Sequence, residues 1–363
     1  MVGRRLLCAS ILIGCFLFGI GAAQNPVVEM NLLSSTAYML DSQDLMQGMG
    51  MDLKISLPSE NSGNVRGEVA FRTTYNSLVP TPITSVDDVI YKAYLRARFP
   101  SFRLTAGKTR LSWGDGMLFN AADILYGSSS VSVDLKQAEL RSKTDWMINV
   151  NYPLGFFSFA EAVFLPSMTG EAQDMGVGGR FYTNAGETKV EGGYLTKKET
   201  TRVHKLYTSL QGNIGPDWYL ASSITIDQSN PSASDIQKSW LISGGLFHMQ
   251  YLSGERNLSL RLEMLSRPFG TWKFESQSEA SCALLLYPEV VYSPTSTLSF
   301  SLRAILSPLD FSTMLFAGAS WSVFEGFALI ANIAAPFGES GDLLLPVSSS
   351  NVLGVTLGAS WIY

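Results

Sequence analysis

Basic residues recur at alternate positions in residues 65–75, 89–99 and 101–109. Because successive side chains of a β-strand point to opposite faces, alternate positions share one face. The charged residues that this parity brings together are Arg66, Glu68, Arg72, Lys92, Arg96, Arg98 and Arg103. Such a set of mostly positive side chains attracts anions and repels cations. An internal salt-bridge network with acids such as Asp52 and Glu263 explains the same residues equally well.

A second group with distinctive spacing lies in residues 107–126. Its polar, glycine and aromatic members are Arg110, Trp113, Gly114, Asp115, Gly116, Phe119, Asn120 and Asp123. Glycines permit backbone angles that other residues resist, and asparagine and aspartate side chains nucleate turns by bonding nearby N–H groups. These residues predict a structured loop. The sequence leaves open whether the loop folds inward and narrows a lumen or covers a rim.

Signatures of catalysis and metal binding are missing from the sequence. Neither His204 nor His248 lies beside a serine in a catalytic motif, and the metalloprotease spacing, the P-loop and the dinucleotide fingerprint do not occur. We therefore predict that the protein is not an enzyme, and that it has no metal site and no cofactor.

The elements that must position these residues show hydrophobicity with a period of two, which is typical of half-buried strands. Turn-forming clusters such as residues 58–64 and 338–342 separate them. The candidate strands lie near 28–40, 48–58, 64–76, 87–99, 101–109, 131–142, 144–153, 156–165, 175–184, 187–197, 203–213, 217–227, 238–251, 257–266, 278–290, 297–307, 313–323, 326–336 and 353–363. Since transmembrane strands need about 9–11 residues and bacterial barrels have even strand numbers, we estimate about 16 to 18 strands, with about 14 possible.

The start of the chain predicts a signal peptide over residues 1–23. A pair of arginines precedes the apolar run 6–20, and small residues follow at the cleavage site. The run is shorter than the roughly 20 residues of a spanning helix, so an uncleaved anchor is the weaker alternative. Cys15 ends a stretch that resembles a lipobox, although apolar residues follow it, and lipidation there stays open.

Composition restricts the function of the remaining residues, 24–363. Of the 26 basic residues two leave with the signal peptide, so 24 remain against 31 acidic residues, a net charge of −7. This balance argues against nucleic acid as a partner. Cys282 is then the single cysteine, which excludes an internal disulfide and a cysteine metal cluster.

The number of strands with one apolar face favours a transmembrane barrel over a soluble sandwich. In a sandwich all apolar faces must meet in one interior, whereas in a bilayer each face contacts lipid. Closure of the sheet then pairs every backbone N–H and C=O group, as hydrocarbon requires. We therefore predict an all-β protein, a closed antiparallel transmembrane β-barrel formed by a single domain over residues 24–363.

The last residues add support for this architecture. In residues 354–363 apolar and small or polar side chains alternate, and the final residue is aromatic. The pattern resembles the terminal strand of outer-membrane barrels, which the barrel-assembly machinery recognises. Trp361 and Tyr363 are the expected assembly signal, while Ile362 departs from the pattern because it is apolar on the lumen side.

Residues 107–126 also resemble a segment of several families of porin-like outer-membrane barrels. That segment contains Arg, then Trp-Gly-x-Gly, then Phe-Asn-Pro-x-Asp. The matching residues are Arg110, Trp113, Gly114, Gly116, Phe119, Asn120 and Asp123, with Ala121 where proline is usual. The resemblance implies an outer-membrane barrel and suggests a channel, without indicating a substrate.

The leading functional hypothesis is a porin-like channel in the cell outer membrane for passive passage of small hydrophilic solutes, with a possible preference for anions. The expected partners are outer-membrane lipid, the assembly machinery and small solutes, and a homo-oligomer is possible. Two alternatives are a plugged barrel that transports a hydrophobic substrate such as a fatty acid, and a structural or adhesive surface barrel. Residues 24–47 are short for a plug, and the loops are short for adhesion.

Overall fold

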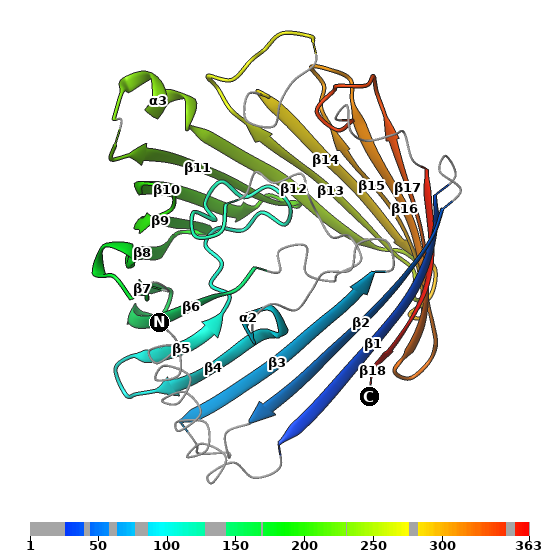
Figure 1. Cartoon of the computed structure of the whole chain (residues 1–363), viewed down its shortest axis with the longest axis horizontal. Helices are drawn as coiled ribbons and strands as arrows, with labels where there is room; N and C mark the ends of the chain where they lie inside the picture. Colours follow the sequence, from blue (N-terminus) through cyan, green and yellow to red (C-terminus); the bar gives the residue numbers. More distant parts are fainter. Residues whose placement is uncertain are drawn as a thin grey trace.

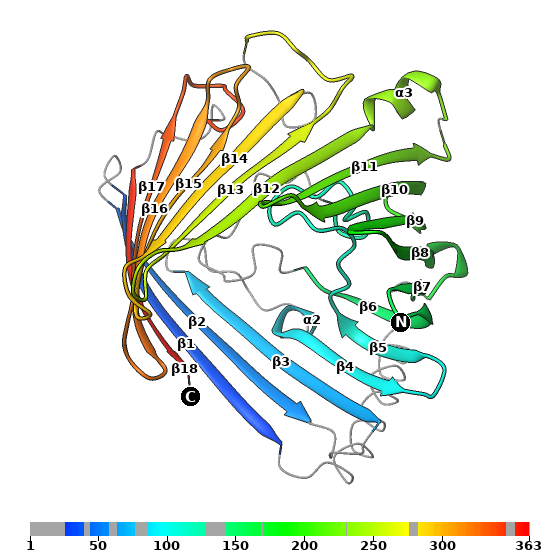
Figure 2. The same cartoon turned by 180° about the vertical axis from the view of Figure 1, so that it is seen from behind.

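A single closed sheet makes up the fold. The computed structural model describes residues 26–39, 44–57, 64–76, 86–127, 143–167, 170–229, 231–275, 282–345 and 353–362. These residues form 18 antiparallel strands in which each strand pairs with its neighbours in sequence. The sheet closes because β1 (Val27–Met39) pairs with both β2 (Asp44–Leu57) and β18 (Gly354–Ile362). Figures 1 and 2 show the resulting ring of strands from its two sides.

The remaining elements are strands and a few short helical turns. The strands are β3 (Val65–Asn76), β4 (Ile90–Arg98), β5 (Arg103–Thr109), β6 (Asp145–Gly155), β7 (Ser158–Leu165), β8 (Gly176–Ala185), β9 (Thr188–Lys198), β10 (Arg202–Asn213), β11 (Asp217–Asp227), β12 (Leu241–Tyr251), β13 (Asn257–Ser266), β14 (Leu284–Ser293), β15 (Leu298–Leu306), β16 (Thr313–Phe324) and β17 (Phe327–Phe337). The helical turns are α2 (Val86–Val89), η1 (Ala172–Asp174) and α3 (Ala233–Lys238). Among the described residues, no helix has both the length and the apolar character needed to cross a membrane.

The structure corrects the expected strand number. The all-β class and the closed antiparallel barrel match the expectation, but the estimate of about 16 to 18 strands with 14 possible is replaced by 18, and a barrel of 14 strands is wrong. The weakly alternating segment 28–40 is a full strand, β1, because its backbone is paired along both edges. The candidate strand 131–142, the signal peptide 1–23 and Tyr363 lie outside the described residues.

The two rims of the barrel differ in the length of their connections. Even-numbered strands are followed by short turns, such as residues 156–157, 186–187 and 325–326. Odd-numbered strands are followed mostly by longer segments, and the one after β5 covers residues 110–144. We call these the short-turn rim and the long-loop rim. In outer-membrane barrels short turns face the periplasm and longer loops face the exterior.

The outer surface carries the large apolar side chains. Exposed examples from five strands are Met49, Tyr75, Leu262, Phe300 and Leu357. A continuous apolar exterior of this kind is unusual for a protein in water. It is the exterior that a transmembrane barrel presents to hydrocarbon.

The inner wall has two different parts. Along β9–β14 many inward side chains are buried. The most deeply buried are Glu191, Leu195, Tyr207, Ser209, Ala221, Ser243, Glu263, Leu265, Leu285 and Tyr287. Along β16–β18 the inward residues include Gly318, Ser320, Asn332, Gly358 and Ser360, which are uncharged, and none of these is buried. The wall of β9–β14 therefore holds buried inward side chains, whereas that of β16–β18 has uncharged inward residues that stay partly accessible.

Candidate functional site

The segment that fills the lumen follows β5. Residues 110–127, which we call the inner loop, run inward from the end of β5 and lie beside β9–β12 (Figure 1). Trp113, Phe119, Asn120 and Ala122 have no exposed surface. The Trp113 ring stacks on Tyr207 of β10 with a centroid distance of 5.5 Å. Of the two positions that the sequence allowed, the inner loop occupies the one inside the barrel.

Polar side chains within the inner loop fix its shape. The Asn120 amide donates to the carbonyl of Trp113 at 2.8 Å, and the Asn120 side-chain oxygen accepts from the Ala122 amide at 3.1 Å. Arg110 forms an ion pair of 2.8 Å with the buried carboxylate of Asp123. Asparagine and aspartate thus supply the local hydrogen bonds that their spacing in the sequence predicts.

Two carboxylates of the wall hold the first part of the inner loop. The Trp113 indole N–H donates to Glu161 of β7 at 2.9 Å, and the Gly114 amide donates to Glu191 of β9 at 3.2 Å. Arg180 of β8 lies between the carboxylates and bonds Glu161 at 2.5 Å and Glu191 at 3.0 Å. This pairing matters because an unpaired charge at such a buried position would be strongly destabilising.

A third carboxylate holds the far part of the inner loop. Glu263 of β13 accepts hydrogen bonds from the backbone amides of Met117, Leu118 and Phe119, each at 2.8 Å. The Tyr219 hydroxyl of β11 donates to the Phe119 carbonyl at 2.7 Å. The inner loop therefore spans from β5 to β13.

Asp115 is also held at the wall, by an ion pair with Lys189 of β9 at 2.7 Å. Gly116 lies so close to the Phe119 carbonyl that an added Cβ would come within 2.0 Å of its oxygen. The inner loop thus brings together all of its predicted residues, from Arg110 to Asp123, and their role in constricting a pore stays a prediction.

Strand register places four of the predicted arginines in directly facing pairs. Arg66 of β3 lies opposite Arg96 of β4, and Arg98 of β4 lies opposite Arg103 of β5. All four lie toward the short-turn rim, next to the turns 58–64 and 99–102. Like charges directly opposite each other in a sheet are destabilising. We call these four residues the arginine cluster.

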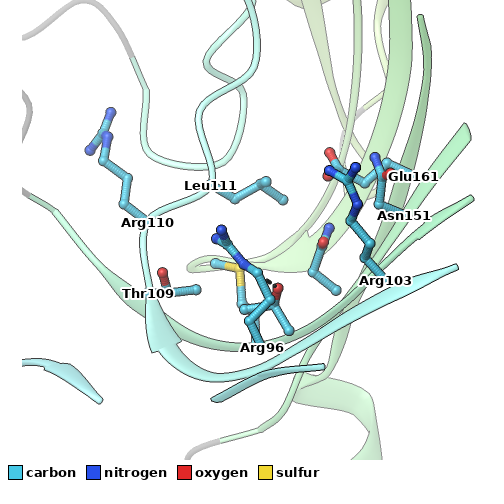
Figure 3. A pocket seen from close by; sticks show the side chains of 10 residues that line it. Arg96, Arg103, Thr109, Arg110, Leu111, Asn151 and Glu161 are labelled. Carbon is cyan, nitrogen blue, oxygen red and sulfur yellow. Dashed lines mark hydrogen bonds between the residues drawn. The ribbon is translucent and has the colours of Figure 1, made fainter. Parts of the chain in front are cut away.

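A recess of about 220 Å³ lies between the arginine cluster and the inner loop. Its lining residues are Arg96, Arg103, Thr105, Thr109, Arg110, Leu111, Met147, Asn149, Asn151 and Glu161. Figure 3 shows the Arg103 guanidinium beside Glu161 and Asn151, while the Arg110 head points away. Arg96 donates to the Thr105 hydroxyl at 3.3 Å. The recess is therefore polar and largely lined by hydrogen-bond donors.

The other predicted charged residues differ from the arginine cluster in their partners. Arg72 forms an ion pair with Asp52 at 2.7 Å, as the salt-bridge hypothesis expects. Glu68 accepts from the Tyr94 hydroxyl at 3.2 Å. The Lys92 ammonium lies 5.2 Å from the centre of the Tyr91 ring.

The parity of Tyr91 differs from the expectation. Alternation from residue 89 assigns Tyr91 to the apolar outer face, but the Arg72 guanidinium lies 4.0 Å from the centre of its ring. A register shift at Ala70 and Phe71 explains the difference, because one extra residue in β4 reverses which side chains face inward. Strict alternation therefore assigns the wrong face to Tyr91.

Sequence reasoning missed several residues of the site. Glu161, Arg180 and Glu191 hold the inner loop, yet only their alternation with apolar neighbours signals that they face inward. Glu263 was expected only as a salt-bridge partner, and its amide contacts lie more than 140 positions apart in sequence. Trp361 is exposed on β18. Among the described residues, no group of three His, Cys, Asp or Glu side chains is arranged to hold a metal ion.

Comparisons with known proteins show the class of the fold. No protein-family model and no curated protein sequence matches the chain. Among solved structures, OpdO (OccK3) of Pseudomonas aeruginosa is 10% identical over 96% of this chain and 98% of its own, with a TM-score of 0.59. The outer membrane protein OpdK of the same organism is 12% identical over 93% and 98%, with a TM-score of 0.57. OccAB4 of Acinetobacter baumannii is 11% identical over 94% and 98%, with a TM-score of 0.56.

At sequence identities of 10–12%, the similarity to these structures shows the fold alone. The chain has the 18-stranded barrel fold of these outer-membrane porins along nearly its whole length.

Proposed function

We propose that the protein is an outer-membrane channel for the passive passage of small hydrophilic solutes, with a preference for anions. The apolar exterior supports the membrane location, because exposed side chains such as Met49 and Leu357 are favourable against lipid and unfavourable against water. The difference between the two rims supports an orientation in which the long-loop rim faces the exterior.

The observation that carries the anion preference is the arginine cluster. Two pairs of like charges, Arg66 with Arg96 and Arg98 with Arg103, face each other in register. Their mutual repulsion is unfavourable in the empty barrel, and an anion between them relieves it. Arginine is also suited to carboxylates, because its planar fork donates two parallel hydrogen bonds. The cluster therefore fits a small carboxylate that passes the short-turn rim.

One of the similar structures supports this chemistry. OpdK of Pseudomonas aeruginosa, 12% identical to this chain, has been solved with vanillate. Vanillate is an aromatic carboxylate, so its charge matches the arginine cluster and the recess lined by Arg96, Arg103 and Asn151. We propose that small carboxylates are the solute class.

The test is a measurement of conductance and selectivity in planar bilayers under a salt gradient. The double variant Arg96→Gln with Arg103→Gln removes one charge from each facing pair. The control is Arg256→Gln, which removes one positive charge, against two in the double variant, from the turn after β12, where the Arg256 guanidinium bonds only Ser253 among its described hydrogen bonds. We expect stepwise wild-type currents with anion preference, a reversal potential shifted toward cations in the double variant, and no shift in the control.

Two results would contradict the proposal. A folded wild-type barrel that conducts no ions would exclude an open channel. Equal reversal potentials for the wild type and the double variant would exclude the arginine cluster as the source of selectivity. Addition of benzoate or vanillate should also reduce the wild-type chloride current, and the double variant should lose most of this block.

A further inference from the structure

Glu263 accepts three hydrogen bonds from successive backbone amides of the inner loop. Its carboxylate is fully buried, and both oxygens accept hydrogen bonds from the inner loop. Oε1 accepts from the Met117 amide, and Oε2 accepts from the amides of Leu118 and Phe119. Successive backbone N–H groups that converge on one point form an anion-binding concavity. Here the anion is a side chain of the barrel itself.

The charge of Glu263 is balanced from the wall side. Arg261, two residues away on the same face of β13, bonds Glu263 Oε1 at 3.2 Å and stacks on Phe247 with 4.6 Å between the guanidinium carbon and the ring centre. Arg261 also reaches Glu289 at 3.5 Å. Arg261 and the three amides thus fix the position of the Glu263 side chain.

Two neighbouring strands hold the same stretch of the inner loop. Ser243 Oγ of β12 accepts from the Ala121 amide at 2.8 Å, and Tyr219 of β11 donates to the Phe119 carbonyl. The side chains of Leu118 and Phe119 contact an apolar cluster of the wall, whose other buried members are Leu265, Cys282, Leu285, Tyr287, Ile305 and Leu344. The far part of the inner loop is thus held by one carboxylate, two neutral hydrogen bonds and an apolar contact.

We propose that Glu263 is the positioning residue that holds the inner loop against β13 and so sets the width and selectivity of the passage. This inference rests on the proposed channel function. Without the carboxylate, the amides of residues 117–119 lose this acceptor at once, while the first part of the inner loop keeps its contacts with Glu161, Glu191 and Lys189. The far part of the inner loop then no longer has one fixed position against β13.

The experiment compares Glu263→Ala and Glu263→Gln with Glu289→Gln. The glutamine side chain of Glu263→Gln would keep one carbonyl acceptor, so this variant tests whether part of the contact is enough to hold the inner loop. It also covers the case in which Glu263→Ala does not fold. Glu289 is the control because it is nearly as buried, pairs with Arg303 at 2.7 Å and accepts from Tyr287 at 2.9 Å, whereas its described hydrogen bonds and ion pairs do not include the inner loop. It shares Arg261 with Glu263, so an effect that acts through Arg261 alone would also appear in this control. Heat-modifiable migration on gels verifies that each barrel is folded.

Two readouts are recorded for each folded variant. The first is amide hydrogen exchange of peptides that cover residues 117–121, and the second is single-channel conductance with its ion selectivity. We expect Glu263→Ala to raise exchange, conductance and current noise severalfold and to weaken anion preference, and Glu263→Gln to have a smaller effect in the same direction. The Glu289→Gln control should stay at wild-type exchange and conductance.

A covalent rescue separates positioning from general destabilisation. In a Cys282→Ser background, Ala121→Cys with Ser243→Cys should form a disulfide across the existing hydrogen bond. Oxidation of this pair in the Glu263→Ala variant should restore the wild-type conductance, and reduction should remove it again.

Three results would overturn the inference. They are unchanged exchange in Glu263→Ala, equal effects of Glu263→Ala and Glu289→Gln, and no rescue by the formed disulfide. The first would mean that the apolar contact of Leu118 and Phe119 is sufficient. If the wild type does not conduct, the proposed function fails, but the exchange data still decide whether Glu263 holds the inner loop.

Discussion

At the scale of single residues, the inner loop depends on small groups in confined positions. Gly114 has a φ of 72°, and an added Cβ would lie 2.5 Å from both the Ala122 Cβ and the Asn120 side-chain oxygen. Its amide also bonds Glu191. The conformation and the confined space therefore both restrict this position to glycine.

The substitution Gly114→Ala should prevent the inner loop from folding against the wall. Gly127→Ala is the matched control, since Gly127 has a φ of 77° but no atom near its potential Cβ. Both changes carry the left-handed backbone strain, about 1–2 kcal/mol, so the difference between them reports the lost space. We expect rapid proteolysis near residue 114 only in Gly114→Ala, and equal protease resistance would refute this account.

The sequence predicts much of the inner loop and little of its anchoring. Trp-Gly-x-Gly and the polar residues Asn120 and Asp123 have local partners, so their spacing carries the information. Glu161 and Glu191 act on residues 48 and 77 positions away. Alternation predicts that both carboxylates face inward. Their position along the barrel axis and their neighbours in space depend on the register of all the strands. This information is not local in the sequence.

At the scale of elements, the long-loop rim is closed partly by contacts between two connections. Asp310, in the segment between β15 and β16, accepts from the Ser312 amide at 3.1 Å, the Ser312 hydroxyl at 2.8 Å and the Leu343 amide at 2.9 Å. Leu343 belongs to the segment between β17 and β18. One carboxylate thus ties the two connections together.

This tie should weaken in acid. Burial alone would raise the pKa of Asp310, but hydrogen bonds from Ser307, the Leu343 amide and Ser312 outweigh it and lower the pKa below 3.8. The ionised carboxylate therefore stabilises the rim above that ordinary value, and the contribution is lost as the pH falls through the lower folded value. The protection of the amides of residues 341–345 against exchange, taken relative to the intrinsic rate at each pH, should fall only below about pH 4.

The variant Asp310→Asn provides the control for this acid effect. It lacks the titrating group, so the protection of residues 341–345, relative to the intrinsic exchange rate, should be low at neutral pH and should not fall further in acid. Wild-type protection that falls between pH 7 and 5, or a variant that keeps the acid step, would assign the effect to another group.

The elements themselves were largely predictable, because a transmembrane strand repeats one simple pattern. The exceptions have structural causes. Tyr91 changes face at a bulge that alternation cannot show, and β5 has only seven residues because the chain leaves the wall there to form the inner loop. Alternation assigns Arg72 and the arginine cluster to the same inward face. Only the strand register shows that Arg72 lies beside Asp52, whereas the arginines of the cluster lie opposite one another.

At the scale of the whole molecule, stability requires that the sheet has no free edge. The strand β18 pairs with β1 from Asn31 to Met39 and with β17 from Phe327 to Ala334. Each backbone group left without a partner in hydrocarbon costs several kcal/mol. Closure therefore depends on the last strand.

A chain that ends at residue 353 should not form a heat-modifiable barrel in detergent, because β1 and β17 become open edges. Trp361→Ala is the control that keeps the backbone pairing, and it should refold in detergent. If Trp361 is part of the assembly signal, the same variant should reach the membrane of cells in smaller amounts. A folded, closed barrel from the truncated chain would refute the requirement for β18.

The two unlike parts of the inner wall have a consequence for the electric field inside the barrel. The arginine cluster lies on β3–β5 and the uncharged inward residues lie on β16–β18, separated from β3 in the ring by β1 and β2. Fixed cations on β3–β5 and none on the described residues of β16–β18 produce a field with a component across the pore. Water and dipolar solutes in such a field align with their negative ends toward β3–β5. The barrel would then control the orientation of a molecule in transit as well as its charge.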